Sequence, residues 1–113
     1  MLRDRIRSFG HAFRGLTTLV RSEANARIHI AAIGVVLVGG WLLEISKNEW
    51  LAVILCIGFV LAMEAMNTAV EKLADHLAPE IHPSVRAVKD IAAAGVLVAA
   101  ITSLAVAAVI LLG

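Results

Sequence analysis

The sequence predicts an all-α integral membrane protein, with an N-terminal amphipathic surface helix followed by three transmembrane helices. Of its 113 residues, 60% are hydrophobic and 17% are charged, whereas soluble domains are nearer to about 45–50% apolar and about 25% charged. Three apolar runs, at 28–43, 50–63 and 91–113, account for the excess. Because little chain remains outside them, we expect one membrane domain over residues 1–113 and no soluble domain.

The surface helix is expected over residues 2–20, within a segment 1–27 that precedes the first span. At 100° per residue its apolar side chains fall on one face, made of Leu2, Ile6, Phe9, Phe13, Leu16 and Val20. Four arginines of this segment lie beside that face, which is typical of a helix in the lipid headgroup region. The alternative is a helix that packs against the spans, and the two are compatible. We expect residues 22–27 to form a polar elbow.

The spanning helices are expected at 28–45, 50–70 and 85–112. Because a span needs about 20 residues, the second apolar run must continue through a polar stretch to Val70. Ser46 and Glu49 have the spacing of a capping box at the start of that helix. The third helix should begin near Pro83 or Ser84. Small residues at Gly34, Gly39, Gly40 and 92–95 permit close helix contact.

The distribution of basic residues predicts how the chain is oriented. Of ten Lys and Arg, six precede residue 28 and three lie between residues 71 and 90, and only Lys47 lies between the first two spans. The positive-inside rule then places the N-terminus and the 71–90 connection in the cytosol, and the 44–50 loop and the C-terminus outside. A cleaved signal peptide is not expected, since the first apolar run follows 27 residues rich in arginine.

The stretch from Glu64 to Asp75 carries most of the chemical information. It follows an unbroken apolar run, and on a helix its polar side chains fall within about 60° of Glu64, namely Asn67, Thr68, Glu71 and Asp75. Carboxylates at the edge of hydrocarbon are costly and are kept where they face protein, water or an ion. Such a stripe suits the binding of a hard cation such as Mg²⁺ and the transfer of a proton.

The predicted topology gathers further polar groups at the same depth. They come from three helices and a loop, and are Glu23, Glu64, Asn67, Glu71, Asp75, His82, Lys89 and Asp90. Cytosolic ATP and a lipid headgroup both reach this surface, and a lysine there would stabilise a transferring phosphoryl group. The chain has no Walker A loop, kinase glycine-rich loop, CxxC or HExxH motif. Any phosphoryl transfer is therefore not performed by a familiar soluble fold.

Several of these residues also have structural interpretations. Glu71 and Lys72 could be a solvated helix end, and His29 a structural hydrogen-bonding group. Lys89 could snorkel to the headgroups or pair with Glu71 or Asp75, and Asp90 could cap the third helix. Glu64 is the hardest to explain structurally, because it lies deepest in the apolar run and has no partner nearby in the sequence.

The combined pattern resembles the prokaryotic diacylglycerol kinase family. It consists of Glu64-x-x-Asn67-Thr68-Ala-Val-Glu71-x-x-x-Asp75, then His82-Pro83, then Lys89-Asp90-x-Ala-Ala-Ala-Gly95, preceded by Ser-Glu23-Ala-Asn25-Ala-Arg-Ile-His29. The resemblance implies a multi-pass lipid kinase of the bacterial plasma membrane, with its active site at the cytosolic surface. It also implies ATP as co-substrate, Mg²⁺ as cofactor, no nucleic-acid partner, and a homotrimer whose neighbouring subunits share active sites.

The resemblance also implies roles for individual residues. Glu64, Asn67 and Lys89 are expected to be catalytic, with Glu64 as the base for the lipid hydroxyl, and Glu23 and Glu71 to bind the metal. The residues expected to contact ATP are His11, Glu23, Glu71, Glu80, His82, Lys89 and Asp90. His11 stands where some members have an aromatic residue. The lipid is expected to contact Phe9, Phe13 and Glu64.

The identity of the lipid stays open between the two branches of that family. One branch phosphorylates diacylglycerol and the other phosphorylates undecaprenol. The Asn25-Ala-Arg-Ile-His29 elbow and the His82-Pro83 loop look more like the undecaprenol branch. A small membrane transporter and a structural membrane subunit are remote alternatives, and ATP hydrolysis that depends on added lipid would separate a kinase from both.

Overall fold

The computed structural model describes residues 1–77 and 82–113, which form four α-helices and contain no strand. They are α1 (Leu2–Ser22), α2 (Ala24–Leu42), α3 (Lys47–Leu77) and α4 (Pro83–Leu112). The last three are each long and apolar enough to cross a membrane. The prediction of an all-α fold with an N-terminal helix and three candidate spans is confirmed.

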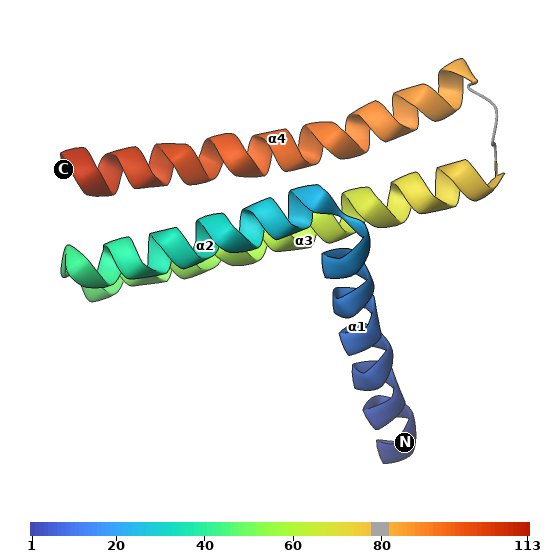
Figure 1. The fold of residues 1–113 in the computed structure, drawn as a ribbon, viewed down its shortest axis with the longest axis horizontal. Helices are drawn as coiled ribbons and strands as arrows, with labels where there is room; N and C mark the ends of the chain where they lie inside the picture. The colour runs from blue at the N-terminus through green and yellow to red at the C-terminus, as the bar shows by residue number, and fades with distance from the viewer. Residues whose placement is uncertain (78–81) are drawn as a thin grey trace.

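The three long helices run side by side, and α1 projects away from them at a steep angle (Figure 1). Helix α3 is the centre of the arrangement, because it packs most extensively against α4 and also contacts α2 and α1. The α2–α3 turn and the C-terminus lie at the same end of the three helices (Figure 1). This arrangement agrees with the predicted placement of the 44–50 loop and the C-terminus on one side.

Helix α1 presents its apolar face away from the rest of the chain. The side chains of that face are exposed, with Phe9 at 69% and Phe13 at 67%, whereas Leu19 is the buried residue of this helix. An exposed apolar face on a helix that crosses the direction of the spans fits a helix lying at the membrane surface. The structure therefore favours the surface helix over a helix that only packs on the spans.

A one-residue corner joins α1 to α2. Glu23 is extended, with φ −118° and ψ 113°, while the Nη1 of Arg27 donates hydrogen bonds of 3.0 Å to the carbonyl oxygens of Val20 and Arg21. These bonds satisfy carbonyls that would otherwise lack partners at the end of α1. The predicted elbow over residues 22–27 is therefore too long, because α2 already begins at Ala24.

The capping box at the start of α3 is confirmed. The backbone N–H of Ser46 donates to Oε1 of Glu49 at 2.8 Å, and the N–H of Glu49 donates to Oγ of Ser46 at 3.2 Å. Nearby, Gly40 leaves room for Trp50, since a Cβ at Gly40 would lie 2.9 Å from Cη2 of that ring. Gly40 thus allows α2 and α3 to approach closely beside their turn.

The length of α3 decides where its polar stripe lies. Thirty-one residues at about 1.5 Å each give roughly 46 Å, which exceeds the ~30 Å of membrane hydrocarbon. Glu64 lies 17 residues, or roughly 26 Å, beyond Lys47. If α3 enters the hydrocarbon near its capping box, Glu64 is close to the opposite edge and the rest of the stripe extends into the headgroup region.

Candidate active site

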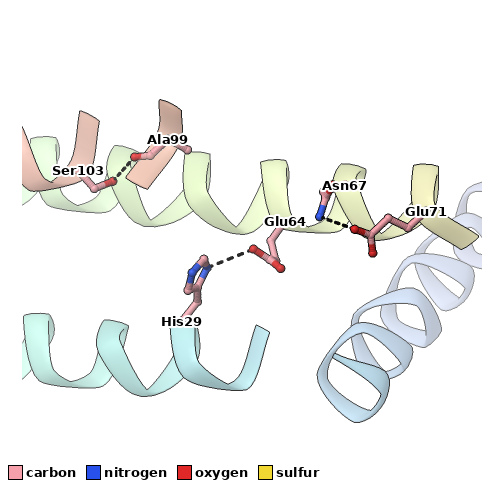
Figure 2. Close-up of polar contacts among 6 residues, drawn as sticks. All are labelled: His29, Glu64, Asn67, Glu71, Ala99 and Ser103. Atoms are coloured by element: carbon pink, nitrogen blue, oxygen red, sulfur yellow. Dashed lines mark hydrogen bonds and ion pairs between the residues drawn. The ribbon is translucent and has the colours of Figure 1, made fainter. Parts of the chain in front are cut away.

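Glu64 is buried and faces a histidine from another helix. Its side chain is only 4% exposed, and its Oε2 lies 3.4 Å from Nδ1 of His29, whose side chain is 25% exposed. Figure 2 shows the two side chains pointing toward each other from α3 and α2. The carboxylate that lacked a partner nearby in the sequence thus acquires one through the packing of α2 against α3.

Three buried polar atoms at this place have no hydrogen-bond partner among the described residues. They are Nδ1 of His29, Oε2 of Glu64 and Oδ1 of Asn67. The large majority of buried polar atoms in proteins are hydrogen-bonded, so each exception calls for an explanation. Two of these atoms, Nδ1 of His29 and Oε2 of Glu64, face each other at 3.4 Å, and Oδ1 of Asn67 is left to accept from a polar ligand.

One turn further along α3, Asn67 and Glu71 form a second contact. Nδ2 of Asn67 donates to Oε1 of Glu71 at 3.4 Å, and both residues are half-buried. The two side chains follow Glu64 along the helix (Figure 2). The amide therefore engages one carboxylate oxygen of Glu71 and leaves the other oxygen for an additional ligand.

A third contact joins the far end of α3 to α4. Nζ of Lys89 donates to Oδ1 of Asp75 at 2.6 Å, and the two side chains are 37% and 66% exposed. The structure therefore forms one of the two ion pairs considered for Lys89, the one with Asp75. A phosphate bound by Lys89 would have to share that ammonium group with Asp75 or displace it.

These three contacts lie at successive levels along α3. Glu64 and Asp75 are 11 residues apart, which is roughly 16 Å along a helix axis. The prediction that all the polar groups lie at one depth is wrong in this respect, because a stripe that stays on one face of a helix also advances along it. The site is elongated, with its buried end at Glu64 and its exposed end at Lys89.

His82, and not Asp90, caps the start of α4. His82 caps α4, since its Nδ1 accepts a hydrogen bond from the N–H of Ser84 at 3.2 Å. Asp90 is exposed and lies well inside α4, so it does not cap that helix. Glu80 lies outside the described residues.

The remaining predicted site residues lie on α1 and at its end. Glu23 is half-buried at the α1–α2 corner. His11 is exposed, and its Nδ1 lies 2.6 Å from Nη2 of Arg14. The contacts with nucleotide, metal or lipid expected for His11, Glu23, Phe9 and Phe13 stay predictions.

An apolar groove of about 320 Å³ begins beside His29. It is lined by residues of α2, α3 and α4, and His29 is the first of its α2 residues, followed by Ala32, Ile33 and Val36. Ser103 also lines it, but its Oγ donates to the carbonyl oxygen of Ala99 at 2.9 Å (Figure 2). The groove therefore offers hydrocarbon-like walls with a polar histidine at one end.

Comparison with known proteins shows the family. The sequence model for prokaryotic diacylglycerol kinase matches residues 10–111. The chain belongs to the prokaryotic diacylglycerol kinase family. It is also 41% identical over 97 residues to the undecaprenol kinase of Bacillus subtilis (strain 168), which covers 86% of this chain and 79% of that relative. The protein is therefore an ATP-dependent membrane lipid kinase, and the transporter and structural-subunit alternatives are excluded.

The carboxylates of this diacylglycerol kinase family member fit a magnesium ion that is held partly by substrate. In residues 1–77 and 82–113, no three His, Cys, Asp or Glu side chains are gathered to hold a metal by themselves. Mg²⁺ is usually bound through one or two carboxylates together with substrate phosphates and water. Glu71, with one oxygen engaged by Asn67, has the donor chemistry of such a partial site.

Two residues of this kinase have partners that the sequence alone does not reveal. His29 is expected from the sequence to be a structural hydrogen-bonding group, but its ring faces the carboxylate of Glu64. Arg27 is expected only as part of the polar elbow, but its guanidinium donates hydrogen bonds to the last carbonyl oxygens of α1. Both residues lie in the Asn25-Ala-Arg-Ile-His29 segment, which the sequence marks as part of the family pattern. Their spacing in that segment does not reveal their partners, because these belong to α1 and α3.

Proposed function

We propose that this kinase transfers the γ-phosphoryl group of Mg-ATP to the hydroxyl group of undecaprenol. The observation that carries the choice of lipid is the 41% identity to an undecaprenol kinase over 86% of the chain. Diacylglycerol is the alternative acceptor, and the name of the family favours it. Both lipids present a primary hydroxyl at the membrane surface, so the polar site serves either.

The proposed reaction uses Glu64 as the base. The lipid hydroxyl oxygen attacks the γ-phosphorus while the bond from that phosphorus to the bridging oxygen of ADP breaks. The hydroxyl proton passes to the carboxylate of Glu64, which is buried between α3 and α2. Base catalysis of this kind typically contributes roughly 10²–10⁴ in rate.

The remaining polar residues are proposed to hold the nucleotide. Asn67 is proposed as an active-site amide. Glu23 and Glu71 would hold Mg²⁺, which when bound neutralises charge on the phosphates. Lys89 would contact the phosphates beside Asp90. The elongated site suits a triphosphate that lies along α3, with its γ-phosphoryl group toward Glu64.

The acceptor lipid is proposed to enter from the bilayer. The apolar groove begins at His29, next to Glu64, so an isoprenoid tail that occupied it would hold its hydroxyl at the base. Phe9 and Phe13 on the exposed face of α1 would contact the same lipid at the membrane surface. His11, Glu80 and His82 are proposed to contact the nucleotide.

The proposed assembly is a homotrimer in the bacterial plasma membrane, with the N-terminus and the active site on the cytosolic side. A single chain leaves most of its apolar span surface exposed. In the most apolar 18-residue stretch of each span, only 6–17% is buried. Gly34 and Gly39 have open space where a Cβ would be, so another helix could approach closely there. Neighbouring subunits would then complete the walls around ATP and lipid.

The acceptor is tested with purified protein, γ-labelled ATP and a single lipid in each reaction. We expect efficient labelling of undecaprenol and weak labelling of diacylglycerol in the same detergent. Preferential labelling of diacylglycerol would overturn the choice of lipid and leave the kinase reaction intact. Crosslinking and sedimentation on the same sample test the trimer, which a fully active monomer would contradict.

A further inference from the structure

The contact between His29 and Glu64 carries an inference about how the base is held. We propose that His29 is a positioning residue that donates its Nδ1–H to Oε2 of Glu64 and so directs the other carboxylate oxygen at the lipid hydroxyl. This inference rests on the proposed role of Glu64 as the base. It assigns to His29 a part in catalysis rather than in folding alone.

The first argument is the state of the two facing atoms. Nδ1 of His29 and Oε2 of Glu64 are 3.4 Å apart, which is longer than the usual 2.7–3.2 Å of an N–H···O bond. Neither atom has another hydrogen-bond partner within the described part of the chain. A histidine with a structural role would normally satisfy its buried nitrogen. Catalytic hydrogen bonds are often long without substrate and shorten in the complex, which fits this pair.

The second argument is how firmly His29 is held. It lies two residues after Arg27, whose guanidinium is bonded to the carbonyl oxygens of Val20 and Arg21. The start of α2 is therefore fixed to the end of α1, and the imidazole has a defined place opposite α3. Within α3, the amide nitrogen of Asn67 is bonded to Glu71 rather than to Glu64, so the facing residue for the buried carboxylate is His29 of α2.

The third argument is the place of His29 at the mouth of the apolar groove. The same ring that faces Glu64 also lines the groove proposed for the lipid tail. A lipid hydroxyl leaving that groove would meet the carboxylate at the point where His29 orients it. Small displacements of a catalytic group can lower the rate by up to roughly 100-fold, so an unanchored Glu64 would be a poor base.

The test compares His29→Ala with His29→Asn in the full-length protein, with His76→Ala as the control on an exposed histidine of α3. The amide nitrogen of asparagine lies near the position of Nδ1 and can donate the same hydrogen bond. We expect His29→Ala to lower kcat by up to roughly 100-fold, with little change in KM for ATP. His29→Asn should recover most of kcat, and His76→Ala should match the wild type.

A second measurement separates positioning from a general loss of structure. In a Glu64→Gln background, His29→Ala should cause almost no further loss of kcat, because residues that act through one another are not additive. An equal loss in both backgrounds would overturn the proposal, as would unchanged kcat in His29→Ala. A well-assembled His29→Asn as poor as His29→Ala would also overturn it. The proposed function fails separately, if the wild type labels no lipid.

Discussion

Two polar side-chain contacts link α3 to its neighbours, and they differ in distance and in burial. Asp75 and Lys89 meet at 2.6 Å with side chains that are 66% and 37% exposed, whereas His29 and Glu64 meet at 3.4 Å with the carboxylate buried. The Asp75–Lys89 pair is within hydrogen-bond distance. The buried pair is long, and its facing atoms lack hydrogen bonds within the described residues.

The shorter contact is the less consequential one for stability. Exposed ion pairs contribute a median of about 0–1 kcal/mol, because water and salt screen the charges. Burying a charge is much more costly unless it is paired and hydrogen-bonded. A poorly satisfied buried carboxylate is therefore a candidate functional group, and the role that we propose for Glu64 is to accept the proton of the lipid hydroxyl.

Replacing Glu64 should produce the largest effect and tests the buried side of the comparison. Glu64→Gln keeps the shape of the side chain but removes its capacity to accept the hydroxyl proton. We expect kcat to fall by roughly 10²–10⁴, while Mg-ATP still binds, as measured by lipid phosphorylation and nucleotide binding. Glu44→Gln, at the exposed α2–α3 turn, is the control. Unchanged turnover in Glu64→Gln would make Glu64 structural.

The next effect tests whether Lys89 belongs to chemistry or only to its pair with Asp75. If Lys89 stabilises the transferring phosphates, Lys89→Ala should assemble normally but lose roughly 100-fold in kcat. Asp75→Asn, which breaks the same ion pair, should lose far less. Lys89→Arg should also be poor, because the guanidinium differs in shape and hydration.

A different pattern of activities would contradict a contact between Lys89 and the phosphates. If the ion pair alone matters, Lys89→Ala and Asp75→Asn should have the same small effect. Near-normal activity in Lys89→Arg with normal expression would then identify Lys89 as an anchor at the headgroups, because arginine snorkels equally well.

A smaller effect on the rate, which depends on the Mg²⁺ concentration, is expected at the two carboxylates proposed to bind metal. Glu71→Ala and Glu23→Ala each remove an anionic oxygen ligand from a cation that accepts few substitutes. The expected result is a higher Mg²⁺ requirement, partly restored by excess metal, in titrations of initial rate. Glu44→Ala serves as the control for loss of a negative charge. If neither titration moves, Glu23 and Glu71 do not bind the metal.

The smallest effect should be on stability at the exposed pair. Asp75→Asn should change the free energy of unfolding by no more than about 1 kcal/mol, and salt should reduce the difference further. Thermal unfolding in detergent at low and high ionic strength measures it. A loss of several kcal/mol would show that the Asp75–Lys89 contact holds α3 and α4 together, and the contrast with the buried pair would disappear.

Local physical chemistry in the sequence was sufficient for the elements of this protein. Apolar run length predicted three spanning helices, since the hydrocarbon sets a minimum length. The Ser46–Glu49 spacing predicted the start of α3, because a capping box is satisfied within four residues. The stripe from Glu64 to Glu71 followed from helical periodicity alone, and the residue pattern around it was enough to identify the family.

Only the tertiary structure decided which side chains meet. His29 faces Glu64, Lys89 takes Asp75 rather than Glu71, and Arg27 closes α1, because these contacts depend on how helices distant in sequence are rotated and staggered against one another. Periodicity gives the face of each helix but neither its neighbour nor its level. The burial of Glu64 likewise came only from packing, because the carboxylate is covered where α2 lies against α3.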